Sequence, residues 1–170
     1  SLVQLIRTFP LNDFSVYLEG VKHTLTDNPY TQKFFDYYNY PPAATLFFYP
    51  LALLPTDASE FILTSLSIVS LFITIWLLFK LTGRKLSCLL FLVSCFLFLR
   101  FSPTRLTLTL GQINLIVLLL IVLSFSWYTK KRQFLSGASL ALAFVFKFTP
   151  IFLLLFFILK KQRKVILGFI

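Results

Sequence analysis

Long apolar runs, separated by short clusters of basic residues, dominate the chain after residue 60. The run 61–79 holds nineteen residues without a charge. A helix needs roughly 20 such residues to cross about 30 Å of hydrocarbon, so this run predicts a membrane span. Two further runs, 86–99 and 111–128, predict two more spans, of which the first is short. The segment 100–110 between them is expected to be a loop.

The last long apolar run, 134–159, exceeds one span and is interrupted by Lys147 and Pro150. Proline breaks the hydrogen-bond ladder of a helix, so two half-helices of about a dozen residues, joined at the break, are expected. One long tilted helix is the alternative interpretation. The re-entrant hairpin would return the chain to the side it left, and residues 165–170 would then begin the next span.

The first sixty residues have another pattern. Residues 1–7 are too short to span a membrane and are interpreted as the end of a first helix, and residues 8–60 as a loop. Part of that loop shows apolar residues at helical spacing, which predicts an amphipathic helix on the membrane surface: Phe14, Tyr17, Leu18 and Val21. Asn12 or Asp13 suits its N-cap. The apolar stretch 43–54 is too short to cross as a helix and is interpreted as re-entrant or interfacial.

Composition supports a membrane protein. The chain is 58% hydrophobic with a mean hydropathy of +0.85, whereas soluble domains have roughly 45–50% apolar residues. The expected fold is therefore an all-α polytopic membrane domain. One His and two Cys in a single apolar run make no cluster of metal ligands, so no metal site is expected. Because the sequence lacks Met and stops inside an apolar run, we expect one membrane domain that is incomplete at both ends.

The basic residues predict an orientation. Thirteen bases and no acids lie beyond residue 60. The net charge of +10 would suggest nucleic acid in a soluble chain, but these bases fall between apolar runs, as in cytoplasmic loops. The turns after residues 80 and 130 are therefore placed inside. The loop 100–110 and residues 8–60, which hold all six acids, are placed outside.

Two kinds of residue suggest chemistry. Four of the six acids lie in the aromatic stretch between Asp13 and Pro42, although Asp13 also fits a plain helix cap. Lys147 falls inside an apolar run, where an unpaired cation costs a few kcal/mol or more, so a functional partner is the default interpretation. The alternative for Lys147 is a side chain that snorkels to the interface.

Several short motifs occur in one order along the chain: Asp13-Phe14 with Tyr17, Asn28-Pro29-Tyr30, Tyr40-Pro41-Pro42, Gly111-Gln112-Ile113-Asn114, and Gly137 with Lys147-Phe148-Thr149-Pro150. In this order they resemble glycosyltransferase family 87, membrane enzymes of the GT-C class that use polyprenyl-phosphate sugars and include mannosyltransferases. The resemblance covers nearly all 170 residues and corresponds to the N-terminal half of such an enzyme. It implies a GT-C-like transmembrane bundle whose outer first loop carries amphipathic helices.

The resemblance also implies a reaction. A hexosyl unit such as mannosyl, or a pentosyl unit, would pass from a polyprenyl-phosphate donor to a lipid or glycan acceptor at the outer face of the cell membrane, without a cofactor or metal. Asp13 occupies the position of the general base of GT-C enzymes. Tyr17, Tyr30 and Tyr40 would contact sugar.

The remaining candidates concern charge and orientation of substrate. The leaving lipid phosphate needs cations, and Arg100 and Arg105 are the bases placed outside, although they would equally suit headgroup contacts. Gln112 and Asn114 would orient substrate or bond neighbouring helices. Lys147 would reach the phosphate or a carboxylate. The rival hypothesis is a polytopic transporter or lipid flippase, since transporters also contain broken helices. A non-catalytic subunit is a third.

Overall fold

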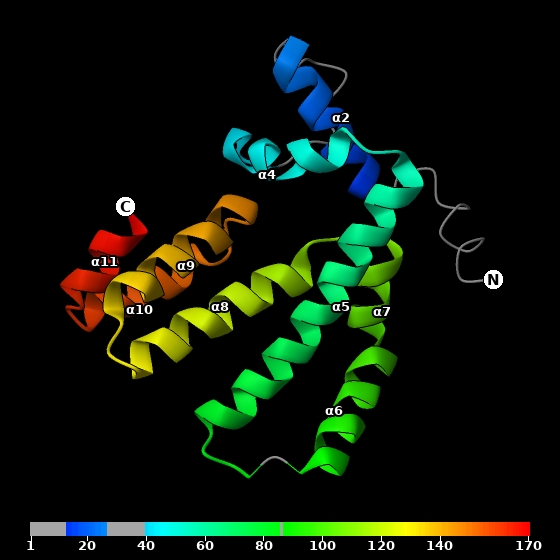
Figure 1. The fold of residues 1–170 in the computed structure, drawn as a ribbon. Coiled ribbons are helices and arrows are strands. Elements are labelled where there is room, and N and C mark those ends of the chain that lie inside the picture. The colour runs from blue at the N-terminus through cyan, green and yellow to red at the C-terminus, as the bar shows by residue number, and fades with distance from the viewer. Residues whose placement is uncertain (1–12, 27–39, 86) are drawn as a thin grey trace.

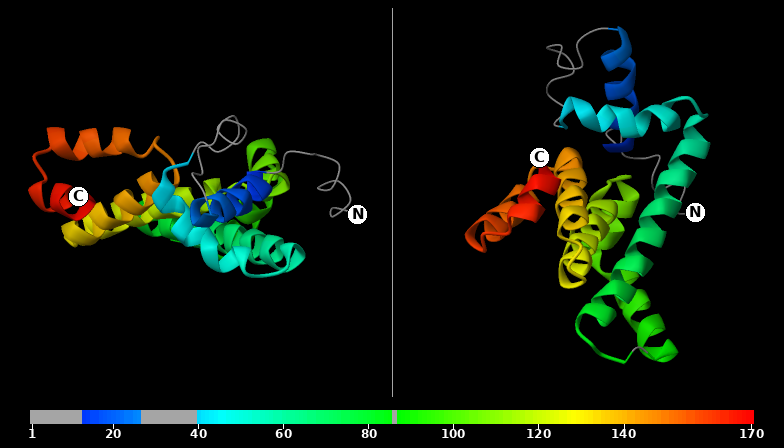
Figure 2. Two further views of the ribbon diagram at one scale, coloured as in Figure 1. Left: turned by 90° about the horizontal axis from the view of Figure 1, so that it is seen from above. Right: turned by 60° about the vertical axis from the view of Figure 1, so that its left-hand side comes forward.

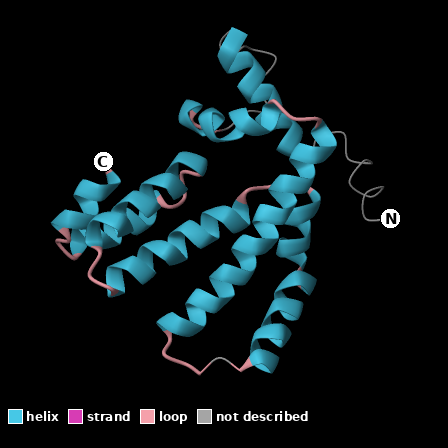
Figure 3. Ribbon diagram, viewed as in Figure 1, coloured by secondary structure: helices cyan, strands magenta, loops and turns pink. Residues whose placement is uncertain are grey.

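The computed structural model describes residues 13–26, 40–85 and 87–170, and this part of the chain contains helices and no strand (Figures 1 and 3). The helices, in chain order, are α2 (Asp13–Thr26), α4 (Pro42–Ala52), α5 (Thr56–Leu81), α6 (Cys88–Arg100), α7 (Ser102–Thr109), α8 (Asn114–Thr129), α9 (Gln133–Phe146), α10 (Ile151–Leu159) and α11 (Arg163–Phe169). The all-helical expectation is confirmed for these residues. The predicted first helix end, residues 1–7, lies outside them.

The helices form a fan around α8. α8 packs between α5 and α9, α6 and α7 run back beside α5, and α11 packs on α9 (Figures 1 and 2). α2 and α4 pack on each other at the end of the fan where α5 begins. The turns that follow α5 and α8 lie at the opposite end, and they carry the basic clusters.

The length of α5 suits a membrane span. It has 26 residues and is the one described helix that is by itself long and apolar enough to cross. α6 and α7 together form a second candidate, bent by 65° at the break between them. The shorter apolar helix α8 corresponds to most of the predicted span 111–128, and α9 to the first half of the predicted re-entrant run 134–159. How either lies in a membrane stays a prediction.

The segment 100–110 was expected to be a loop, and this expectation is wrong. Ser102–Thr109 form α7, with a proline in the first turn, where the missing N–H costs no helical hydrogen bond. Thr104 and Thr107, three residues apart and hence on one face, are both buried. The alternating Leu and Thr pattern suggested no helix. The helix forms because packing of α7 against its neighbours outweighs that local preference.

The chain also changes direction after α9. α9 ends at Phe146, Lys147 has an extended backbone, and α10 runs back from Ile151 (Figure 2). The following helix, α11, lies against α9 at a point where both helices have glycine. A Cβ on Gly137 would meet the backbone of Val165, and one on Gly168 would meet the backbone of Phe134. The two glycines therefore permit the closest helix contact in this part of the fold.

One buried cluster joins α2, α4, α5, α8 and α9 near the start of α5. α2 contributes Phe14, Tyr17 and Val21, each at most 2% exposed, with Leu18 packed beside them. The helical spacing of these residues predicted an apolar face, and that face is confirmed. Its burial fixes the rotation of α2, so the position of Asp13 at the start of the helix follows from it.

Candidate active site

Asp13 lies in the first turn of α2, and its carboxylate contacts the turn between α7 and α8. Gln112 Nε2 donates a hydrogen bond to Asp13 Oδ2 at 2.6 Å, between residues 99 positions apart in the chain. Asp13 is half-buried. Among the described residues no donor contacts Oδ1. Within the described part of the chain, one carboxylate oxygen of Asp13 is therefore held by Gln112 and the other has no donor.

The turn that carries Gln112 depends on glycine. Gly111 has a φ of +65°, a conformation that costs glycine little and other residues more. Its N–H bonds the carbonyl of Leu108, and the N–H of Gln112 bonds the carbonyl of Thr107 at 2.9 Å. This pair of bonds is the Schellman motif, which ends α7 and turns the chain into α8. The backbone of Gln112 is thereby fixed within the turn between α7 and α8.

Asn114 determines which way the Gln112 amide points. Asn114 Nδ2 donates to Gln112 Oε1 at 2.6 Å and lies 3.3 Å from Thr107 Oγ1. A carboxylate only accepts hydrogen bonds, so the NH₂ group of Gln112 faces Asp13, and Gln112 Oε1 is left to accept from Asn114. The chain of bonds Asn114 to Gln112 to Asp13 orients the carboxylate. Both amides were predicted either to contact substrate or to bond neighbouring helices, and here they bond the protein.

Tyr17, one turn after Asp13 on α2, is packed by aromatic rings. Its ring stacks on Phe48 at 4.4 Å between centroids, and its hydroxyl lies 3.0 Å from the hydroxyl of Tyr40. Burial raises the pKa of the Tyr17 phenol, and Tyr40 and the charge of Asp13 raise it further. Burial also raises the pKa of Tyr40. Both phenols are therefore neutral at physiological pH and act as hydrogen-bonding groups.

The aromatic contacts extend to the end of α9. Phe146 lies 5.0 Å from Phe47 and 6.1 Å from Phe48, measured between ring centroids. Phe48 in turn stacks on Tyr17, so the end of α9 lies at the same end of the molecule as α2. Lys147 is the residue that follows Phe146. Lys147 is partly exposed. A cation from the break after α9 thus lies on the side where α2 and α4 gather.

The model of glycosyltransferase family 87 matches residues 38–170. The chain belongs to glycosyltransferase family 87. Members of this family are membrane glycosyltransferases, so the chain is a glycosyltransferase by family. No curated protein and no solved structure matches it. The matched residues include Gln112, Asn114 and Lys147 and begin after Asp13 and Tyr17.

The two arginines expected to bind phosphate do not join this network in the family 87 chain. Arg100 ends α6 and Arg105 lies on α7, and both are exposed. Arg105 is two residues from Thr107, yet neither arginine is bonded to Asp13. Tyr30, expected to contact sugar, lies outside the described residues. The structure thus brings together Asp13, Tyr17, Tyr40, Gln112 and Asn114, and the ring of Phe146, which precedes Lys147, contacts Phe48 beside them.

Three residues of this family 87 site have no role in the sequence hypothesis. Thr107 accepts from Asn114, Phe48 stacks on Tyr17, and Phe146 closes the aromatic contacts. Thr107 and Phe48 occur in segments interpreted as a loop and as an interfacial stretch. Phe146 is one of 22 phenylalanines, and nothing local distinguishes it. The one sequence feature that could have drawn attention to Phe146 is its position directly before Lys147.

Proposed function

We propose that this family 87 protein transfers a hexosyl unit, mannosyl in the first instance, or a pentosyl unit, from a polyprenyl-phosphate donor to a lipid or glycan acceptor. Asp13 acts as the general base at the outer face of the cell membrane, in a multi-pass chain. The observation that carries the proposal is the hydrogen bond between Asp13 and Gln112, which holds one carboxylate oxygen, while no donor among the described residues contacts the other.

The chemistry needs a base near the acceptor. Oδ1 of Asp13 takes the proton of the acceptor hydroxyl, while the oxygen of that hydroxyl attacks the anomeric carbon of the donor. The bond between that carbon and the phosphate oxygen breaks, and the lipid phosphate leaves with the electron pair. Gln112 keeps the carboxylate oriented throughout. Tyr17 and Tyr40, both neutral, support the sugar side of the site.

The departing phosphate gains negative charge, which cations stabilise. Lys147 follows Phe146, whose ring contacts Phe48 beside Tyr17, and Arg100 and Arg105 are exposed on α6 and α7. α5 has acidic residues near its start and a basic residue in its last turn, and this distribution supports an outward position for the end that carries α2. Basic turns lie at the far end of the molecule from α2, as cytoplasmic turns would.

The deciding experiment is a transfer assay on membranes that carry the full chain, with radiolabelled polyprenyl-phosphate mannose as donor. Asp13→Asn keeps the shape of the side chain and removes the base. General bases contribute on the order of 10²- to 10⁴-fold, so the variant should lose transfer by that factor. Glu19→Gln is the matched control, because Glu19 lies on the same helix and pairs with Lys22 at the surface.

The outcomes separate the candidates. Transfer by the wild type that is lost in Asp13→Asn and kept in Glu19→Gln supports the class and the base together. Equal transfer by Asp13→Asn refutes the base. The break in the chain after α9 favours a transporter as the second candidate. Movement of labelled lipid across the membrane without any new glycosidic bond would favour that candidate.

A further inference from the structure

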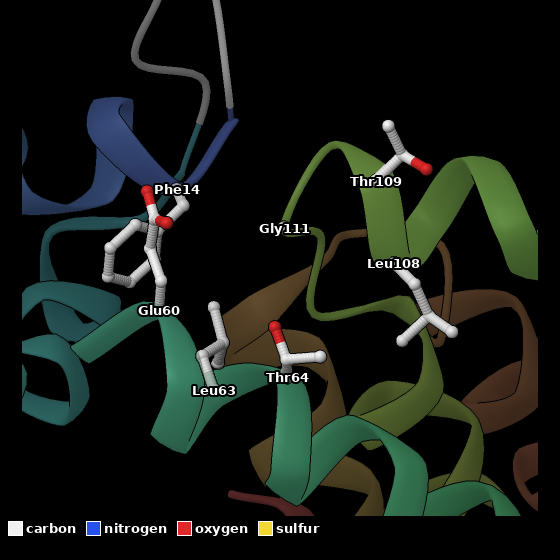
Figure 4. Close-up of a pocket in the computed structure, with 7 residues that line it drawn as sticks. All are labelled: Phe14, Glu60, Leu63, Thr64, Leu108, Thr109 and Gly111. Atoms are coloured by element: carbon white, nitrogen blue, oxygen red, sulfur yellow. The ribbon is translucent and has the colours of Figure 1, made fainter. Parts of the chain in front are cut away.

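A pocket lies between α2, the start of α5 and the end of α7. Seven residues line it: Phe14, Glu60, Leu63, Thr64, Leu108, Thr109 and Gly111. Figure 4 shows Glu60, Leu63 and Thr64 on α5 facing Leu108 and Gly111, with Phe14 beside Glu60 and Thr109 at the rim. The space admits about 20 Å³, which suits one water-sized group.

The polar side chains of this pocket have no hydrogen-bond partner among the described residues. Glu60 is half-buried, and no hydrogen bond or ion pair to it occurs among the described residues. The same holds for the hydroxyls of Thr64 and Thr109 within that part of the chain. A half-buried carboxylate that the fold leaves without a donor is costly unless water or a ligand supplies one.

The pocket adjoins the proposed general base. Phe14 follows Asp13 in the chain, and Gly111 precedes Gln112, the two residues joined by the 2.6 Å hydrogen bond. Two walls of the pocket are thus direct neighbours of the pair that holds the catalytic carboxylate. A molecule that places one hydroxyl at Asp13 can place another part of itself in the pocket.

We propose that this pocket is a subsite of the acceptor, in which Glu60 accepts a hydrogen bond from a second hydroxyl of the acceptor sugar. The inference rests on the proposed transfer function and adds to it a residue that determines acceptor position. The charge of Glu60 decides between the two substrates, since a carboxylate repels the phosphate of the donor and attracts a hydroxyl donor. The small volume limits the pocket to a single hydroxyl.

The test measures acceptor kinetics in membranes that carry the full chain, with polyprenyl-phosphate mannose as donor. The acceptors are octyl glycosides of common hexoses, and the glycoside that the wild type uses is then compared with its monodeoxy analogues. Glu60→Gln keeps the shape of the side chain and removes its charge. Asp57→Asn is the matched control, because Asp57 lies in the first turn of α5, close before Glu60 in the same helix, is exposed and does not line the pocket.

Glu60→Gln should lower kcat/KM for the parent glycoside on the order of 10- to 100-fold, mainly through the acceptor KM, with the donor KM unchanged. One deoxy analogue should cost the wild type a similar factor and cost the Glu60→Gln variant nothing more. That loss of additivity is the signature of a direct contact. Asp57→Asn should behave as the wild type.

Other results overturn the proposal. If Asp13→Asn abolishes transfer while Glu60→Gln keeps the wild-type acceptor KM, the subsite is refuted and the proposed function stands. An equal loss with the parent glycoside and every deoxy analogue would assign Glu60 a structural role and refute the subsite as well. If the wild type uses none of the glycosides, the sugar acceptor and the subsite both fail.

Discussion

The two ends of α5 differ in how their charges are held. At its start, Glu60 lines a pocket next to Asp13, and Asp13 is bonded to Gln112 from a turn 99 residues away. At its end, Lys80 lies 4.0 Å from the ring centre of Trp76, four residues before it in the same helix. The first end is assembled from distant parts of the chain. The second end is formed by one helix and the exposed turn that follows it.

This difference separates chemistry from topology. Exposed bases at a helix end set orientation by their number and need no fixed geometry. The carboxylate proposed as the base needs a defined position, and a Schellman turn, an amide pair and an aromatic stack surround Asp13. Activity should therefore depend on single contacts at the first end and tolerate single changes at the second.

The first prediction compares a glutamine at the proposed site with a glutamine at the basic end, and it carries the largest effect expected after that of Asp13→Asn. Gln112→Leu removes the donor to Asp13, and kcat should fall on the order of 10- to 100-fold, because a hydrogen bond to a charged group is lost. Gln162→Leu is the control at the basic end, where Gln162 accepts from Gln133 at 2.9 Å. Transfer by this variant should match the wild type. Equal losses in both variants would show that the amides serve packing alone.

The second prediction concerns the scaffold away from the site. Gly137→Ala places a methyl group against the backbone of α11, which must shift, so the free energy of unfolding should fall by about 1–3 kcal/mol. Gly168→Ala meets α9 from the other side and should cost a similar amount. Thermal melting in detergent measures both. Wild-type melting in both variants would contradict the close contact between α9 and α11.

The sequence predicts the features that depend on a local pattern and misses those that depend on contacts between distant parts of the chain. The apolar runs and the face of α2 are visible in it, because burial imposes a helical period on Phe14, Tyr17 and Val21. α7 was missed, since packing decides its conformation. Asp13 and Gln112 were both singled out, but as separate features. Their contact depends on how α2 lies on the start of α8, and no local pattern encodes that.

The third prediction compares bases at the two ends. If Arg105 contacts the donor phosphate, Arg105→Ala should raise the donor KM about tenfold, the loss expected for one charge-assisted hydrogen bond. Lys130→Ala removes an exposed base from the turn after α8 and should leave the donor KM unchanged. Titration of polyprenyl-phosphate mannose at saturating acceptor measures both. An unchanged donor KM in Arg105→Ala would remove Arg105 from the site.

The smallest expected effect concerns the buried phenol beside Asp13. Tyr17→Phe loses the hydrogen bond to Tyr40, which should cost about 1 kcal/mol near pH 8. Because the pKa of Tyr17 is raised in the folded protein, the unfolded chain loses this proton first as the pH rises above about 10. The wild type should then lose up to about 1.4 kcal/mol of stability per pH unit that the variant does not lose.

The melting temperatures of Tyr17→Phe and the wild type should therefore converge between pH 9 and pH 11, values set by the ordinary tyrosine pKa of about 10. The titration of lysines is common to both proteins and cancels in the comparison. Parallel curves over this range would mean that the Tyr17 phenol ionises equally in the folded and unfolded chain. The phenol would then be accessible to water, and the aromatic stack on Phe48 would not shield the side of the site next to Asp13.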